Sequence, residues 1–305
     1  MTFASTANVV VHVGGTPIFA DIRRHDLNID PKEIKHRITK RTKAIMPVHM
    51  AGLPCDMREI QEIADAHNIP VIEDAAHAIG ATYGGKKIGA SGNFVCFSFY
   101  PTKNITTIEG GLLCTPNDKA AELVKILRMH GQSADAWKRF SSGSAKSYKI
   151  VEAGFKYNMT DVQAAVGLKQ IEKIDKLLEV RKGIADFYSE ELKHTPGIIL
   201  PIPDLPGRTR VWYAYCILVK KEELGMDRDA VMARLAEKGI GTGIHFEALS
   251  TQPYYHERFG YKPGMFPEAE YVSERTLSLP LSANMTEEDA MYVADTLKST
   301  LKRGP

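Results

Sequence analysis

Three polar side chains that could bind a cofactor follow one another in the first half of the chain. Asp74 ends the apolar run 71–74, Ser98 ends the run 94–98, and Lys103 lies five residues beyond that serine. Pyridoxal 5′-phosphate (PLP) needs an acid at its ring nitrogen, hydrogen-bond donors at its phosphate and a lysine at its aldehyde. This ordered set of carboxylate, hydroxyl and amine therefore predicts a PLP site.

Each of these residues also has an ordinary structural interpretation. Asp74 could cap a following helix, Ser98 could be a simple strand-end serine, and Lys103 is one of 39 Lys and Arg residues. We expect Asp74 to be largely buried, and a buried carboxylate must be paired or hydrogen-bonded. Lys103 lies between an aromatic strand end and the turn at 109–111, where a lowered pKa would make it a nucleophile. His77 could contact the cofactor ring or its 3′-oxygen, or lie on a helix face.

Alternating strands and helices are expected to position these side chains. Strands are predicted at 16–22, 44–49, 71–74, 94–98 and 111–114, and helices at 31–38, 56–67 and 118–130. This alternation predicts an α/β fold, with a buried, mostly parallel sheet and helices on both faces. Ligands of such open sheets bind outside the carboxyl ends of the strands, so Asp74 and Ser98 can converge on one crevice.

A smaller α/β domain is predicted for the C-terminal part. A long helix opens at Thr160 or Asp161, and a polar stretch at 132–149 before it reads as a loop. Further on we expect strands at 211–219 and 240–246, a helix at 228–238 and a C-terminal helix from Thr286. We therefore assign a large domain to residues 1–165, and an interdomain helix with a small domain to residues 166–305.

Composition argues against several other classes of protein. The net charge of +2 and pI of about 8.2 provide no basic patch for nucleic acid. No apolar run approaches the roughly 18 residues of a membrane span, and no secretory signal is evident, so we expect a cytoplasmic protein. The four cysteines and ten histidines show no metal-ligand spacing, so no metal is expected. The glycine-rich run 84–92 matches no phosphate-binding motif and predicts a hairpin turn.

Several motifs give the chain a specific resemblance. It resembles the DegT/DnrJ/StrS family of PLP-dependent nucleotide-sugar aminotransferases, which have the type I aminotransferase fold. The motifs that carry this resemblance are the runs 2–8, 41–49, 71–78, 97–111, 154–165, 239–246 and 278–281. Within the family, the runs 156–158, 240–246 and 251–255 are most similar to the subgroup of UDP-4-amino-4-deoxy-L-arabinose–oxoglutarate aminotransferases.

The resemblance implies a role for each residue around the cofactor. Lys103 would bond to PLP and move the proton between substrate and cofactor, while Asp74 would pair with the pyridine nitrogen. Ser98 would bind the phosphate. Phe3 would stack on the ring, and His77 would lie beside it.

The resemblance also implies a shared site and a pair of substrates. Asn158 would reach the phosphate of the neighbouring subunit's cofactor in a homodimer, and His245 would line the sugar-nucleotide end. Glutamate would donate the amino group, giving 2-oxoglutarate and an aminated sugar from a nucleotide-linked keto sugar. The loops at 132–149 and 247–262 are expected to select that sugar, for a polysaccharide or lipopolysaccharide pathway.

One departure from the family keeps other interpretations open. The resemblance implies a segment before Thr2 that carries a phosphate-binding helix start and two strands, so we expect a truncated N-terminus. A catalytically silent fragment or a PLP-binding regulatory relative is the alternative to an active enzyme. A PLP-dependent sugar dehydratase of the same fold is disfavoured, since those relatives lack the lysine that Lys103 supplies.

Overall fold

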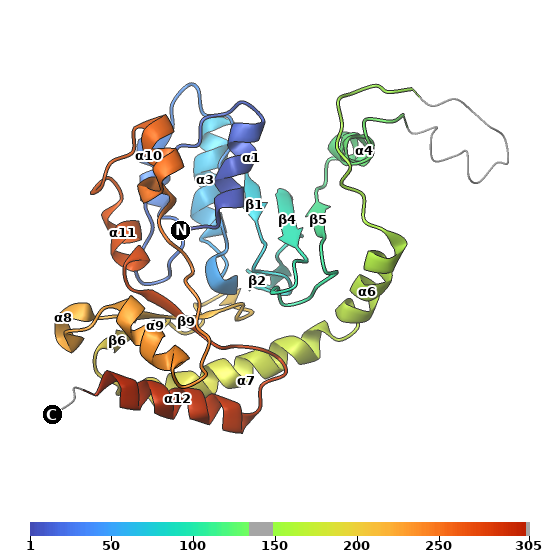
Figure 1. The fold of residues 1–305 in the computed structure, drawn as a ribbon. Helices are drawn as coiled ribbons and strands as arrows, with labels where there is room; N and C mark the ends of the chain where they lie inside the picture. Colours follow the sequence, from blue (N-terminus) through green and yellow to red (C-terminus); the bar gives the residue numbers. More distant parts are fainter. Residues whose placement is uncertain (134–148, 303–305) are drawn as a thin grey trace.

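The computed structural model describes residues 1–133 and 149–302 (Figure 1). The predicted loop at 132–149 therefore lies almost entirely outside the described residues. Elements up to the interdomain region are α1 (Ala4–His12), α2 (Pro31–Arg37), η1 (Met50–Gly52), α3 (Met57–His67), β1 (Ile72–Asp74), β2 (Thr82–Tyr83), β3 (Lys86–Lys87), β4 (Phe94–Ser98), β5 (Gly111–Cys114), α4 (Asp118–Leu127) and α6 (Asp161–Ile171). Those that follow are α7 (Ile174–Leu192), β6 (Ile198–Ile199), β7 (Arg208–Thr209), β8 (Tyr215–Val219), α8 (Lys221–Leu224), α9 (Arg228–Ala236), η2 (Leu249–Thr251), α10 (Pro253–Phe259), α11 (Pro267–Ser273), β9 (Thr276–Leu279) and α12 (Glu287–Leu301).

The sheet that carries the predicted site has the strand order β1-β4-β5. Strands β1 and β4 are parallel, and Ile45 and Val48 add parallel bridges to Val71 and Asp74 on the other side of β1. Strand β5 runs antiparallel to β4 and makes the sheet mixed. Figure 1 shows α1 and α3 beside β1, and α4 and α6 on the far side of β5. The α/β class is confirmed, and Asp74 and Ser98 both lie at carboxyl strand ends.

Several predicted strands are shorter than expected or absent. The run 16–22 forms only the bridge Ile22–Ile29, and the Asp21 carboxylate accepts from the Ile22 N–H and from the Ala269 N–H at the start of α11. The run 44–49 forms only the two bridges to β1, and the run 240–246 forms only the bridge from Gly243 to Ser278. Glycines at 241 and 243 weaken that last strand because they contribute no side chain to pack.

Two other predicted elements have different limits. The strand expected at 211–219 begins only at Tyr215, because Val211 and Tyr213 donate their N–H groups to the 51–52 turn instead. The long helix from Thr160 is divided into α6 and α7 at residues 172–173.

Local sequence signals at helix starts are confirmed. The Asp30 side chain accepts from the Lys32 N–H, with Pro31 as the first helical residue. Thr160 and Thr286 each form a capping box with the residue three positions later, which satisfies free N–H groups of the first turn. Gly84 and Gly85 form the predicted hairpin turn between β2 and β3, with φ of 57° and 79°. Two positive φ values are what a type I′ turn needs.

A separate apolar core lies in the C-terminal half. It is built from α7, β8, α9, β9 and α12, and its fully buried side chains include Tyr188, Ile217, Leu235 and Leu297. Its strands belong to the sheet with the order β6-β8-β9, and Figure 1 shows α12 running alongside α7 below that sheet. Within residues 1–133 and 149–302, no helix combines the length and hydropathy needed to cross a membrane.

Candidate active site

Asp74 occupies the carboxyl end of β1, where two hydrogen bonds orient its carboxylate. The Thr6 hydroxyl donates to Oδ2 over 2.6 Å, and the Ala76 N–H donates to Oδ1 over 3.0 Å. The Thr2 hydroxyl lies 2.6 Å from that of Thr6 and extends the chain of contacts. As expected, most of Asp74 is buried, and the rest of the residue remains accessible. It lies at the open end of the strand, where the paired Cys96 is exposed as well.

Lys103 is held in the turn that follows β4. Its backbone N–H donates to the Tyr100 carbonyl over 2.9 Å, and its Nζ lies 4.5 Å from the ring centroid of Tyr213. Burial lowers the pKa of the Lys103 amine, and the opposite charge of Asp74 only partly offsets this. A lysine with a lowered pKa has more of the neutral amine that attacks a carbonyl carbon.

His77 lies on the same aromatic ring. Its imidazole is 5% exposed and stacks on Tyr213 with a centroid distance of 3.9 Å and an interplanar angle of 11°. Burial, followed by the charges of Lys103 and His245, holds the pKa of His77 well below its usual value, so the ring is neutral. Among the described residues, the buried His77 Nδ1 has no hydrogen-bond partner.

His245 and Phe3 reach this cluster from distant parts of the chain. His245 Nδ1 lies 2.6 Å from the Ser278 hydroxyl, and burial, with a smaller effect of the Lys103 charge, lowers its pKa to about 4. Phe246 lies 5.7 Å from His77 and 6.0 Å from Phe3, measured between ring centroids. Phe3 is 62% exposed, so one face of its ring remains free. The structure therefore brings His77 and His245 close to Lys103, and Phe3 adjoins His77 through Phe246.

The two predicted phosphate ligands lie outside this cluster. Ser98 ends β4, and its hydroxyl accepts from the Tyr100 N–H over 3.4 Å. The Asn158 amide donates to the Met159 carbonyl over 3.5 Å, while its Oδ1 is buried without a partner among the described residues. Turning that amide by 180° would present an N–H group instead, which is the donor that a phosphate requires.

These side chains fit the chemical groups of PLP. The Asp74 oxygens each have a further lone pair for a protonated pyridine nitrogen, and the unpaired Nδ1 of His77 can bond to an oxygen on the ring. The Lys103 amine has the pKa shift that a carbonyl-binding lysine needs. Within the described chain, no group of three or more His, Cys, Asp or Glu side chains could hold a metal ion.

Two residues of the site were not found by sequence reasoning. Thr6 lies within the 2–8 motif, and its contact with Asp74 spans 68 residues. Tyr213 is more than a hundred positions from both His77 and Lys103, and only the fold brings its ring to them. Thr6 could have been suspected because it is a polar residue inside a family motif. Nothing in the sequence around Tyr213 indicates its place in the site.

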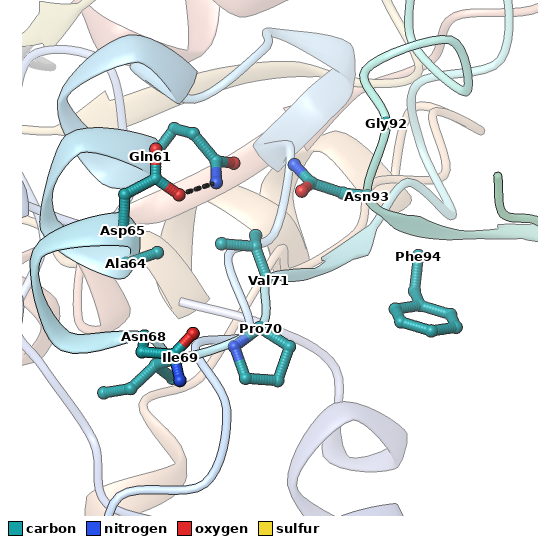
Figure 2. A pocket seen from close by; sticks show the side chains of 10 residues that line it. All are labelled: Gln61, Ala64, Asp65, Asn68, Ile69, Pro70, Val71, Gly92, Asn93 and Phe94. Atoms are coloured by element: carbon teal, nitrogen blue, oxygen red, sulfur yellow. Dashed lines mark hydrogen bonds between the residues drawn. The ribbon is translucent and has the colours of Figure 1, made fainter. Parts of the chain in front are cut away.

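An open pocket lies at the opposite end of the same strands. Figure 2 shows its lining, which includes Asn68, Pro70 and Val71 before β1 and Asn93 and Phe94 at the start of β4. Asp74 and Ser98 lie at the other ends of these strands. This pocket is therefore distinct from the carboxyl ends of the strands, where Asp74 and Ser98 lie.

Comparison with known proteins agrees with this arrangement. The sequence matches the DegT/DnrJ/EryC1/StrS aminotransferase family over residues 1–298. The chain belongs to this family. It is 48% identical to the uncharacterized protein MJ1066 of Methanocaldococcus jannaschii over 297 residues, covering 97% of this chain and 77% of that protein. It is 41% identical to the spore coat polysaccharide biosynthesis protein SpsC of Bacillus subtilis over 303 residues, covering 99% and 78%.

Solved structures of other members of the aminotransferase family have the same fold. Helicobacter pylori PseC, an aminotransferase of pseudoaminic acid biosynthesis, has a TM-score of 0.90 at 28% identity, with 98% of this chain and 77% of PseC covered. DesV of S. venezuelae has a TM-score of 0.88 at 30% identity, with 100% and 77% covered. A sugar aminotransferase of Streptococcus pneumoniae is similar in both its PLP and PMP forms. The predicted family, type I fold and cofactor are confirmed, and the protein is a PLP-dependent sugar aminotransferase.

Proposed function

We propose that this aminotransferase transfers the amino group of glutamate to a nucleotide-linked keto sugar, specifically a UDP-4-keto sugar. The observation that carries the proposal is the Lys103 amine, which has a lowered pKa and lies close enough to Asp74 and His77 to interact with them electrostatically. The Nδ1 atom of His77 has no hydrogen-bond partner among the described residues. The resemblance of the runs 240–246 and 251–255 to the UDP-4-amino-4-deoxy-L-arabinose subgroup favours this sugar. The similarity to SpsC, a spore coat polysaccharide biosynthesis protein, supports a polysaccharide pathway, and lipopolysaccharide is kept as the product that we propose from the subgroup resemblance.

Five residues are proposed to hold the cofactor. Asp74 would accept from the pyridine nitrogen, Ser98 would donate to the phosphate, and Asn158 would reach the phosphate in the partner subunit. Phe3 would lie against the ring, and His77 would bond to it through Nδ1. When bound, PLP supplies an aldehyde and an electron-accepting ring.

The proton transfer is assigned to Lys103. In its neutral form, the Nζ atom can take a proton from the substrate carbon and return it to the cofactor side. Its lowered pKa makes that neutral form more abundant near pH 7 than for an ordinary lysine. His245, neutral at the same pH, is proposed to line the sugar-nucleotide end, where its Nε2 can hydrogen-bond without adding a positive charge.

A homodimer with shared active sites is proposed from the exposed apolar side chains near Asn158. Phe155 and Tyr157 are 51% and 75% exposed, with their rings stacked 4.9 Å apart. Val162 and Leu168 on α6 are 72% and 65% exposed. Soluble monomers rarely expose a large contiguous apolar surface. A second copy of the chain that covers these side chains would also bring Asn158 to the cofactor of the partner subunit.

The remaining expectations from the sequence are kept as proposals. The separate C-terminal core supports a division into a large domain at 1–165 and a small domain at 166–305. The near-neutral charge supports small-molecule substrates over nucleic acid or a membrane, and a cytoplasmic location. The loop 247–262, with part of 132–149, is proposed to select the sugar.

The visible absorbance of the purified protein with PLP tests the proposed role of Lys103. Spectra are recorded before and after glutamate is added, for the unchanged chain, Lys103→Ala and the exposed control Lys169→Ala. We expect an absorbance band of protein-bound PLP in the unchanged chain and in the control, and its loss on adding glutamate. The band should be absent in Lys103→Ala.

Sugar substrates are tested next by mass spectrometry of candidate UDP-keto sugars.

In the absorbance experiment, an equal band in Lys103→Ala would remove the assignment of the lysine. A Lys103-dependent band that glutamate leaves unchanged would remove glutamate as the donor. No band in any variant would favour a catalytically silent relative.

A further inference from the structure

The ring of Tyr213 links the two reactive side chains of the site. It stacks on the His77 imidazole, and the Lys103 Nζ lies 4.5 Å from its centroid. Among residues 1–133 and 149–302, its hydroxyl makes a single long contact, 3.3 Å to the Thr102 hydroxyl. The ring rather than the hydroxyl therefore makes the contacts that matter to the site.

The backbone around Tyr213 is held in an uncommon conformation. Trp212, directly before it, has φ of 39°, and Ala51, which accepts the Tyr213 N–H over 3.3 Å, has φ of 52°. Residues other than glycine seldom occupy this left-handed region, and for a bulky residue it is a clear outlier. Such strain persists only where the surrounding structure enforces it, and it concentrates at functional sites.

Several anchors enforce this conformation. The Val211 N–H donates to the Gly52 carbonyl over 3.2 Å, and the buried Arg181 donates to the carbonyl groups of Trp212 and Tyr213 over 3.4 Å. At Gly52, an added Cβ would lie only 3.0 Å from the His77 carbonyl and 3.3 Å from the Trp212 nitrogen. A glycine is required because the segments carrying His77 and Tyr213 pass so closely at this point.

We propose that Tyr213 is a positioning residue, whose ring fixes the His77 imidazole and the Lys103 amine relative to each other. Asn104, next to Lys103, donates to the Val211 carbonyl over 3.0 Å, so the lysine turn and the 211–213 segment are tied together by a second contact. A cation near an aromatic face is attracted by the ring, which gives the charged amine a defined position whenever it is not bonded elsewhere. The inference rests on the proposed role of Lys103.

Histidine NMR of the full chain without added PLP tests the stack directly. In the unchanged protein, the His77 ring protons should be shifted upfield by the ring current of Tyr213, and His77 should not titrate near its ordinary value of about 6.5. In Tyr213→Leu, the upfield shift should disappear and the His77 pKa should rise toward that value, because water reaches the imidazole. Tyr213→Phe should retain the unchanged behaviour, as should the exposed control Tyr292→Leu.

The rate at which PLP is captured, followed by visible absorbance, reports on Lys103. Tyr213→Leu should slow capture by about two- to fivefold, because water that reaches the amine raises the Lys103 pKa and leaves less of the neutral nucleophile, and Tyr213→Phe should not. If Tyr213→Leu does not fold, as judged by circular dichroism, Gly52→Ala takes its place, because it displaces the 211–213 segment without changing either ring.

Unshifted His77 protons in the unchanged protein, or the same His77 titration in a folded Tyr213→Leu variant, would overturn the proposal. These NMR results do not depend on transamination. A failure of the glutamate half-reaction would therefore leave them interpretable.

Discussion

Glu73 offers the sharpest test of how the site is supported from within the core. Its side chain and that of His49 are both 0% exposed, and His49 Nε2 lies 3.0 Å from Glu73 Oε2. The Cys55 N–H donates to His49 Nδ1, which places the histidine proton on Nε2, facing the carboxylate. Ser91 and Asn93 donate to the other oxygen over 2.6 and 2.8 Å. Because Glu73 precedes Asp74, this network fixes the strand that ends in the active site.

Glu73→Leu would remove the carboxylate and leave three donors. Ser91 is exposed and Asn93 is half-buried, so both can bond to water instead, whereas the His49 N–H cannot. An orphaned buried donor costs about 1–3 kcal/mol, and each hydrogen bond lost from the charged carboxylate is worth about 1.5–3 kcal/mol. We expect Glu73→Leu to lower the free energy of unfolding by about 3–4 kcal/mol. The double variant His49→Phe with Glu73→Leu should recover only part of this, because it removes the unpaired His49 N–H but leaves the buried Cys55 N–H without its acceptor.

Urea unfolding at several pH values measures these effects. Hydrogen bonds from His49, Ser91 and Asn93 lower the pKa of Glu73 despite its burial. A carboxylate with a lowered pKa stabilises the fold above its unfolded value, about 4.3, and this contribution is lost as the pH falls through the folded value. The difference between the unchanged chain and Glu73→Gln should therefore narrow below about pH 4. A cost of Glu73→Leu below about 1 kcal/mol at pH 7 would refute the reasoning.

Three further predictions concern the site and the C-terminal core. Thr6→Val removes the 2.6 Å bond to Asp74 and should weaken PLP binding about tenfold in absorbance titrations, with Thr6→Ser close to unchanged. His245 should titrate with a midpoint near 4 by NMR, and its contribution to stability should decline as the pH falls from about 6.5 toward that value; a midpoint above 6 would contradict its burial. Leu235→Ala, at a fully buried position, should cost about 2–5 kcal/mol in urea unfolding, whereas Leu168→Ala, 65% exposed, should cost little unless the proposed dimer forms.

Local signals in the sequence determined the starts of several helices and the order of the proposed cofactor ligands. The caps at Asp30, Thr160 and Thr286 depend on residues within three positions, so they can be recognised without knowing the fold. Asp74 and Lys103 were likewise identified from their places beside strands. These predictions rest on residues that lie close together along the chain, so they can be made from the sequence alone.

Only the tertiary structure decided which residues complete the site. The strand predicted at 16–22 is absent, and Asp21 within it binds N–H groups of α11, nearly 250 residues away. Tyr213 reaches His77 and Lys103 only because the 51–52 turn and Arg181 hold its backbone in place. Such long-range contacts depend on how whole elements pack together, and neither residue type nor spacing along the chain records that packing.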